Sequence, residues 1–82
     1  MQAIFITNHY RVLTAIYNHT TTIGDESYCP LRQNEIAAEL GLSRIAVNKI
    51  FIDLCQIGYL RKLARGKWKL TDEAVAFIHA TS

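Results

Sequence analysis

Apolar residues recur at intervals of three and four near the start of the chain, from about Ile4 to His19. This spacing predicts a helix with one buried stripe, capped by Thr7 or Asn8. The expected stripe consists of Ile6, Tyr10, Leu13, Ile16 and Tyr17. The next segment, TTTIGDESYCP, is rich in threonine and contains a Gly-Asp turn signal. It predicts a loop, with Tyr28-Cys29 as a very short edge strand before Pro30.

Two closely spaced helices are predicted in the middle of the chain. The first spans about Gln33 to Leu40 and ends at Gly41, because glycine adopts the left-handed conformation after a last turn most easily. The second begins after Ser43, a good N-cap, and runs to about Gln56. Its inward stripe is Val47, Ile50, Phe51 and Leu54, and Ile57 is expected to close the core near Gly58.

The last part of the chain predicts two strands and a helix. The strands are 60–63 and 67–70, around a tip at Ala64-Arg65-Gly66. In the second strand Trp68 and Leu70 alternate inward, whereas the first alternates less well and suggests a bulge. Thr71 caps a final helix whose first turn is acidic and whose apolar face comprises Ala74, Val75, Phe77 and Ile78.

Positive charge is concentrated in one part of the sequence. The 82 residues carry a formal charge of +2, and residues 1–82 are expected to form a single small domain. Residues 41–70 alone carry +6, because seven Lys and Arg face only Asp53, whereas 1–40 and 71–82 each carry −2. Such a segment is expected where one surface meets a polyanion, although a solvated charged surface stays open as an alternative.

Seven positions in 36–50 agree with a helix-turn-helix. Ala37 allows two helices to cross closely, Gly41 makes the turn and Leu42 fills the corner between them. The other four positions face inward and are Ile36, Leu40, Val47 and Ile50, with Leu54 one turn further on.

NEIAAELGLSRIAVNKIFIDLCQIGYL, followed by RKLARGKWKLTDEA, resembles the winged helix-turn-helix of bacterial transcriptional regulators. It is similar to the DNA-binding portions of the catabolite-activator (CRP) and MarR types over about residues 31–78. The resemblance implies a mainly α fold with a three-helix core, a two-stranded wing and a C-terminal helix. It also implies a cytoplasmic regulator of transcription that binds double-stranded DNA, with the third helix in the major groove and the hairpin as wing. From its length we expect neither a CRP-like effector domain nor long MarR-like dimerisation helices.

The third helix is expected to contact bases through four residues. Asn48 suits adenine, Arg44 or Lys49 suits guanine, and Ile45 suits a thymine methyl group. Phosphate and wing contacts are expected from Arg32, Gln33, Ser43, Arg61, Lys62, Arg65, Lys67 and Lys69. Such families often have threonine or serine where this chain has Arg32, which cannot accept a capping hydrogen bond. A phosphate contact and simple solvation both stay open for Arg32.

The sequence offers little for catalysis or metal binding. His9, His19 and His79 are scattered and interpreted as buried or solvated, and no zinc-ligand spacing or phosphate-binding glycine loop occurs. We therefore expect no enzyme activity, cofactor or metal.

The start, MQAIFIT, lacks the features of a secretory signal and no run reaches transmembrane length, which predicts a soluble intracellular protein without a membrane partner. Cys29 and Cys55 are expected to be reduced thiols.

A rival hypothesis is a winged-helix protein-interaction module of a larger assembly, with Ile45 and Ile52 at the contact. For Ile52 a partner contact, a dimer surface and partial exposure all stay open. A homodimer is expected under the DNA-binding hypothesis, because one recognition helix contacts few base pairs.

Overall fold

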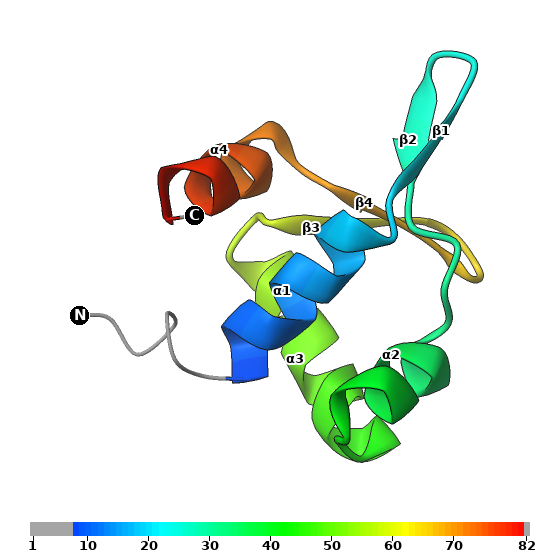
Figure 1. Ribbon diagram of the computed structural model, residues 1–82, viewed down its shortest axis with the longest axis vertical. Coiled ribbons are helices and arrows are strands. Elements are labelled where there is room, and N and C mark those ends of the chain that lie inside the picture. Colours follow the sequence, from blue (N-terminus) through cyan, green and yellow to red (C-terminus); the bar gives the residue numbers. More distant parts are fainter. Residues whose placement is uncertain (1–7, 82) are drawn as a thin grey trace.

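The computed structural model describes residues 8–81 (Figure 1). The elements, in order, are α1 (Asn8–Asn18), β1 (Thr21–Ile23), β2 (Glu26–Tyr28), α2 (Gln33–Leu40), α3 (Arg44–Gln56), β3 (Leu60–Ala64), β4 (Lys67–Leu70) and α4 (Asp72–Thr81). Helices α1, α2 and α3 pack together, the β3–β4 hairpin lies against α3, and α4 lies beyond the hairpin. The predicted winged helix-turn-helix is thus confirmed. No helix in this range has the length and apolar character needed to cross a bilayer.

One hydrophobic core joins these elements. Its buried side chains come from all four helices, from both strands of the β3–β4 hairpin and from Cys29. Within residues 8–81 no polar or charged residue is buried. Burial raises the pKa of the Cys29 thiol, which keeps it in the neutral form that suits a core position. The core is therefore the principal source of stability, and the polar groups are left on the surface.

The predicted stripe of α1 is right only in part. Leu13 and Ile16 are buried as expected, but Val12 and Ala15 are buried with them and Tyr17 lies on the surface, 36% exposed. Helix α1 packs against α2, α3 and β4, so the surface it buries is broader than a single stripe. The predictions for Ile4, Ile6 and Thr7 lie outside the described residues.

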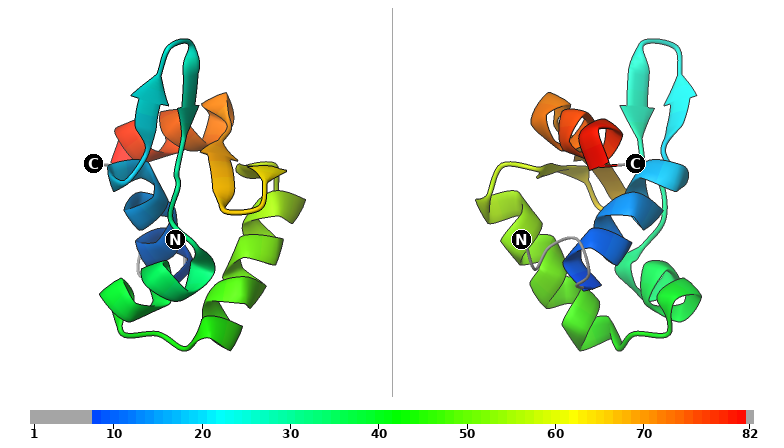
Figure 2. Two further views of the ribbon diagram at one scale, coloured as in Figure 1. Left: turned by 90° about the vertical axis from the view of Figure 1, so that its right-hand side faces the viewer. Right: turned by 60° about the vertical axis from the view of Figure 1, so that its left-hand side comes forward.

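The segment between α1 and α2 is a second hairpin rather than a loop. Strands β1 and β2 pair antiparallel, with Ile23 opposite Glu26 across the two-residue turn Gly24-Asp25. The threonines and isoleucine of β1 are β-branched and favour a strand. Figures 1 and 2 show this hairpin projecting away from α2 and α3. The edge strand expected at Tyr28-Cys29 is confirmed, because Cys29 pairs with Trp68 through two backbone hydrogen bonds of 2.6 and 3.1 Å.

The helix-turn-helix has its predicted turn and cap. Gly41 has φ +71°, and its N–H donates to the carbonyl of Ala37 at the end of α2. Leu42 is half-buried against the core. Ser43 Oγ then accepts a hydrogen bond of 3.0 Å from the N–H of Ala46, so α3 starts where the sequence predicts. The turn fixes the angle between α2 and α3, and this angle determines the exposed surface that the two helices form together.

The prediction for Ile57 is wrong. This side chain is 56% exposed. Helix α3 ends at Gln56, and Gly58, with φ +82°, turns the chain so that Leu60 enters the core instead. Tyr59 packs beside Phe77 of α4, with 5.6 Å between ring centroids. The glycine therefore ends the helix as predicted, but the residue before it points to solvent.

The β3–β4 hairpin is irregular in the way its sequence indicates. Arg61 lies opposite Lys69 and Lys62 opposite Trp68, and the register then shifts between Lys62 and Ala64. This shift is the predicted bulge. Trp68 points inward and packs edge-on against Phe51 of α3, with 4.7 Å between ring centroids. The hairpin is therefore joined to α3 through aromatic packing.

Candidate nucleic-acid interface

Helix α3 has two different sides. Val47, Ile50, Phe51 and Leu54 are buried, as the sequence predicts. The first turns of the opposite side carry Arg44, Ile45 and Asn48, all exposed. Ile52, two turns beyond Ile45, is 47% exposed. The apolar residues of this helix therefore fall into two groups. One group is buried and forms part of the core, whereas Ile45 and Ile52 are exposed to solvent.

The start of α2 faces the start of α3. The N–H of Arg32 donates to Glu35 Oε1 at 2.7 Å, which satisfies a backbone group at the start of the helix. The guanidinium of Arg32 can only donate hydrogen bonds, and it makes no capping hydrogen bond. The cap is thus held by Glu35, and the charge of Arg32 is available to a ligand.

A groove of about 500 Å³ lies between the starts of α2 and α3 and the β3–β4 wing. Four cations and three amides line it, together with Gly66 and Trp68, and no carboxylate does. The charged and amide residues are Arg32, Gln33, Asn34, Arg44, Asn48, Lys62 and Arg65. Clustered cations without a neutralising acid create a positive potential that attracts a polyanion.

Trp68 connects this groove to the core. Its ring packs against buried Phe51, and Lys62 Nζ lies 5.7 Å from its ring centroid, within cation–π range. Lys62 and Trp68 are opposite each other across the two strands, so they share one side of the hairpin. The position of Lys62 beside α3 therefore depends on a side chain that is itself fixed by the core.

A smaller hollow of about 250 Å³ adjoins the groove at the start of α3. It is lined by Gln33 from α2 and by Arg44, Ile45 and Asn48 from α3. Ile45 is the apolar member of this lining. In this hollow, three side chains that can donate hydrogen bonds therefore surround the apolar side chain of Ile45.

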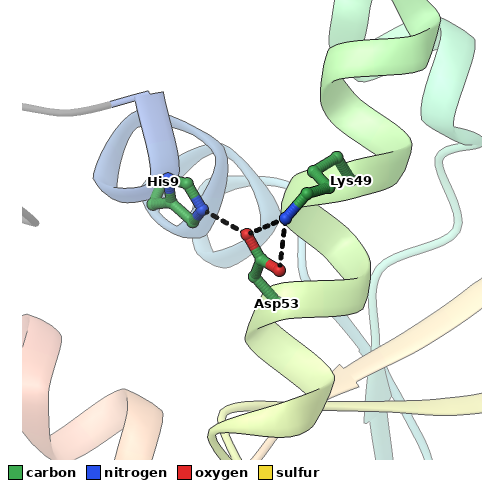
Figure 3. Close-up of polar contacts among 3 residues, drawn as sticks. All are labelled: His9, Lys49 and Asp53. Carbon is green, nitrogen blue, oxygen red and sulfur yellow. Dashed lines mark hydrogen bonds and ion pairs between the residues drawn. The ribbon is translucent and has the colours of Figure 1, made fainter.

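Lys49 lies outside both hollows and is paired within the protein (Figure 3). Its Nζ donates to both carboxylate oxygens of Asp53, at 3.1 and 3.2 Å, and His9 Nε2 of α1 lies 2.8 Å from Asp53 Oδ2. The hydrogen bond from His9, followed by those from Lys49, lowers the pKa of Asp53. Lys49 is thereby turned along α3 toward α1.

Three wing cations also lie outside the groove. Arg61 and Lys69 are opposite each other on the side of the hairpin away from Lys62 and Trp68. Lys67 Nζ lies 5.0 Å from the ring centroid of Tyr28. Like charges directly opposite in a sheet destabilise it slightly, and no ion pair within residues 8–81 involves these three residues. The wing therefore presents positive charge on both of its sides.

The residues expected at the interface thus separate into groups. The structure brings Arg32, Gln33, Arg44, Asn48, Lys62 and Arg65 together around the groove, with Ile45 beside them. It places Lys49, Arg61, Lys67 and Lys69 elsewhere and uses Ser43 as a helix cap. Sequence reasoning missed Asn34, which an exposed amide next to Gln33 in the first turn of α2 would have suggested. It assigned Trp68 to the core alone. Contacts with DNA stay predictions for all of these residues.

The three histidines make polar contacts near the surface. Besides His9, His19 Nε2 lies 2.6 Å from Glu39 Oε1 and His79 Nε2 lies 2.9 Å from the hydroxyl of Tyr17. In the described part of the chain, no three His, Cys, Asp or Glu side chains are grouped so that they could hold a metal ion.

Comparisons with known proteins give structural neighbours only. No family model matches the sequence, and no curated protein matches it. The CO-sensing protein from R. rubrum, in its reduced Fe(II) form, has a TM-score of 0.77 and 22% identity over 90% of this chain. A transcriptional regulator of the CRP/FNR family from Thermus thermophilus has a TM-score of 0.73 and 23% identity over 93% of this chain. The chain spans 35% and 41% of those proteins, so it has the fold of one part of each.

Proposed function

We propose that this chain binds double-stranded DNA sequence-specifically as the DNA-binding unit of a transcriptional regulator. Helix α3 enters the major groove, and the β3–β4 wing lies along the phosphate backbone or in the adjacent minor groove. The observation that carries the proposal is the groove of about 500 Å³, which has four cations in its lining and no carboxylate. The shared fold with a CRP/FNR transcriptional regulator supports it.

The geometry suggests a role for each side of the groove. Arg44 and Asn48 lie in the first two turns of α3 and are exposed, so Arg44 can donate hydrogen bonds to a guanine edge and Asn48 can pair with an adenine edge. Arg32 and Lys62 flank them from α2 and the wing, where phosphates on either side of a major groove would lie. Arg65 at the wing tip would enter a minor groove. The cations outside the groove would then strengthen binding through neighbouring phosphates.

The salt dependence of binding tests this proposal. Fluorescence anisotropy of a labelled duplex is measured from about 50 to about 200 mM salt. If Arg32 and Lys62 contact phosphates, the slope of log affinity against log salt is at least as steep as about −2, because each contact contributes roughly −0.9. Participation of the outer cations makes the slope steeper. No binding at low salt, or binding that does not weaken with salt, would overturn the proposal.

We also expect two copies to bind two half-sites about ten base pairs apart, because one α3 contacts few bases. Sedimentation of the chain with and without a selected duplex tests this. A complex containing one copy at saturation would contradict it.

Protein recognition is a second candidate function, favoured by the exposure of Ile45 and Ile52 on one side of α3, at 82% and 47%. Replacing Ile52 with glutamate would then abolish partner binding. Under the DNA-binding proposal, the same change reduces affinity for DNA only through its added negative charge.

A further inference from the structure

Ile45 is the most exposed large apolar side chain in residues 8–81, with 82% of its surface accessible. It is the second residue of α3 and lies away from the buried Val47 and Ile50. An isoleucine this exposed contributes almost nothing to the core and forfeits the free energy that burial would provide. Its side chain is therefore available to contact a ligand without any loss to the core.

The surroundings of Ile45 define what could cover it. The side chain shares the hollow of about 250 Å³ with Gln33, Arg44 and Asn48. All three neighbours can donate hydrogen bonds. A complementary surface would therefore present one small apolar group bordered by hydrogen-bond acceptors.

The major-groove edge of thymine and its neighbours has this pattern, and 5-methylcytosine shares the methyl group with it. Thymine carries a methyl group at C5 beside the O4 acceptor, and purines present N7, with O6 in guanine. An unmethylated cytosine has neither the methyl group nor an O4 acceptor. The methyl group would cover part of Ile45, and the acceptors would meet the adjacent amides and guanidinium.

We propose that Ile45 makes this chain selective for a methyl group at C5 of one pyrimidine in its binding site. The inference rests on the proposed DNA binding and adds one determinant of base preference. The methyl group can come from thymine or from 5-methylcytosine, and the two sources are separated by experiment.

Ile52 provides a matched comparison on the same helix. It is half-exposed and lies outside both the groove and the smaller hollow. Ile52→Ala removes the same atoms as Ile45→Ala from the same element. A difference between the two variants therefore reports on the hollow around Ile45 and not on the loss of an exposed isoleucine in general.

The test begins with a duplex selected by the purified chain from a random library. The duplex is then synthesised with each thymine in turn replaced by uracil, which removes the C5 methyl group and keeps the base-pairing edge. At one position we expect affinity to fall about threefold to fivefold, the effect of losing burial of one methyl group. Ile45→Ala makes the thymine and uracil duplexes equivalent, whereas Ile52→Ala keeps the difference. Circular dichroism verifies that both variants are folded.

A second set of duplexes separates the two sources. The sensitive base pair is replaced by cytosine–guanine, with and without a methyl group at cytosine C5. If methylation restores part of the affinity, and Ile45→Ala removes that gain, the methyl group itself is recognised. If methylation has no effect while uracil still weakens binding, thymine is recognised through its methyl and O4 together.

The outcomes distinguish this inference from the function on which it rests. Binding that is insensitive to uracil at every position would overturn the role of Ile45 and leave the proposed DNA binding intact. The same conclusion follows if Ile45→Ala retains the full preference for thymine. Failure to bind any duplex would overturn the proposed function, and this inference with it.

Discussion

Two sets of cations in this small protein differ in what surrounds them. The groove cations converge on one hollow with three amides and are Arg32, Arg44, Lys62 and Arg65. The outer cations lie apart from that hollow and are Lys49, Arg61, Lys67 and Lys69. Among the outer cations, Lys49 pairs with Asp53 and Lys67 lies over Tyr28. Charge clustered in the sequence is therefore divided in space, and one member of the groove set, Arg32, comes from the acidic first half of the chain.

Charge reversal at the groove should have the largest effect. We expect Arg44→Glu with Arg65→Glu to weaken duplex binding by at least about a hundredfold, or about 3 kcal/mol, because two attractions become repulsions. The matched pair Arg61→Glu with Lys69→Glu changes net charge equally on the other side of the wing. It should weaken binding by no more than about tenfold. Anisotropy at one fixed salt concentration measures both, and equal losses would show that the groove has no special role.

Removing the aromatic link beneath the groove should reduce stability. Trp68 is half-buried and packs against Phe51, so Trp68→Ala is expected to lower the free energy of unfolding by about 2 to 3 kcal/mol. Trp68→Phe retains a ring and should lose less than half of that. Urea unfolding measures the change in each variant. If Trp68→Ala were as stable as the original chain, the wing would not depend on this packing.

Local signals account for the parts of the fold that the sequence predicts well. Gly41 and Ser43 act on backbone groups within four residues of themselves, so their effects are visible in the sequence. The inward side of α3 follows from helical spacing alone. The β1–β2 hairpin was missed because its strands have three residues each and the pattern across its turn is too short to show alternation.

Contacts between distant segments explain what the sequence did not predict at the site. Lys49 was expected at base edges, yet it pairs with Asp53, four residues further along α3. Asp53 in turn lies 2.8 Å from His9, which is 44 residues away in the sequence. The contact between His9 and Asp53 exists only because α1 packs against α3. The division of the wing cations likewise depends on strand register, which places Lys62 with Trp68 and Arg61 with Lys69. Composition located the positive segment, but only packing determined which side each charge occupies.

The turn that brings α2 to α3 should be sensitive to a single methyl group. Gly41 has φ +71°, and a Cβ there would meet nothing within 4 Å, so the cost of Gly41→Ala is the backbone strain alone, about 1 to 2 kcal/mol. Gly41→Asn should cost less, because asparagine tolerates this conformation better. Thermal or urea unfolding compares the two. Equal stability of Gly41→Ala and the original chain would mean that the turn can readjust.

The smallest change in stability that we expect comes from replacing Asp53, the carboxylate that pairs with Lys49. Its pKa is lowered from the ordinary 3.8 by His9 and then Lys49, so its ionised form stabilises the fold above that pH. The contribution is lost as pH falls below 3.8 toward the lower folded-state pKa. The urea midpoint of Asp53→Asn should therefore lie below that of the original chain near neutral pH, and the gap should close in acid.

The same substitution should strengthen DNA binding. Asp53→Asn removes a negative charge beside α3 and releases Lys49, so we expect affinity to rise about twofold to fivefold at low salt and less at high salt. Glu39→Gln is the matched control, because Glu39 also pairs with a histidine but lies on α2 and makes no ion pair with a cation of α3. An equal rise in both variants would indicate net charge alone. A fall in affinity for Asp53→Asn would mean that Lys49 binds DNA in the orientation that Asp53 gives it, and Lys49 would then join the groove cations.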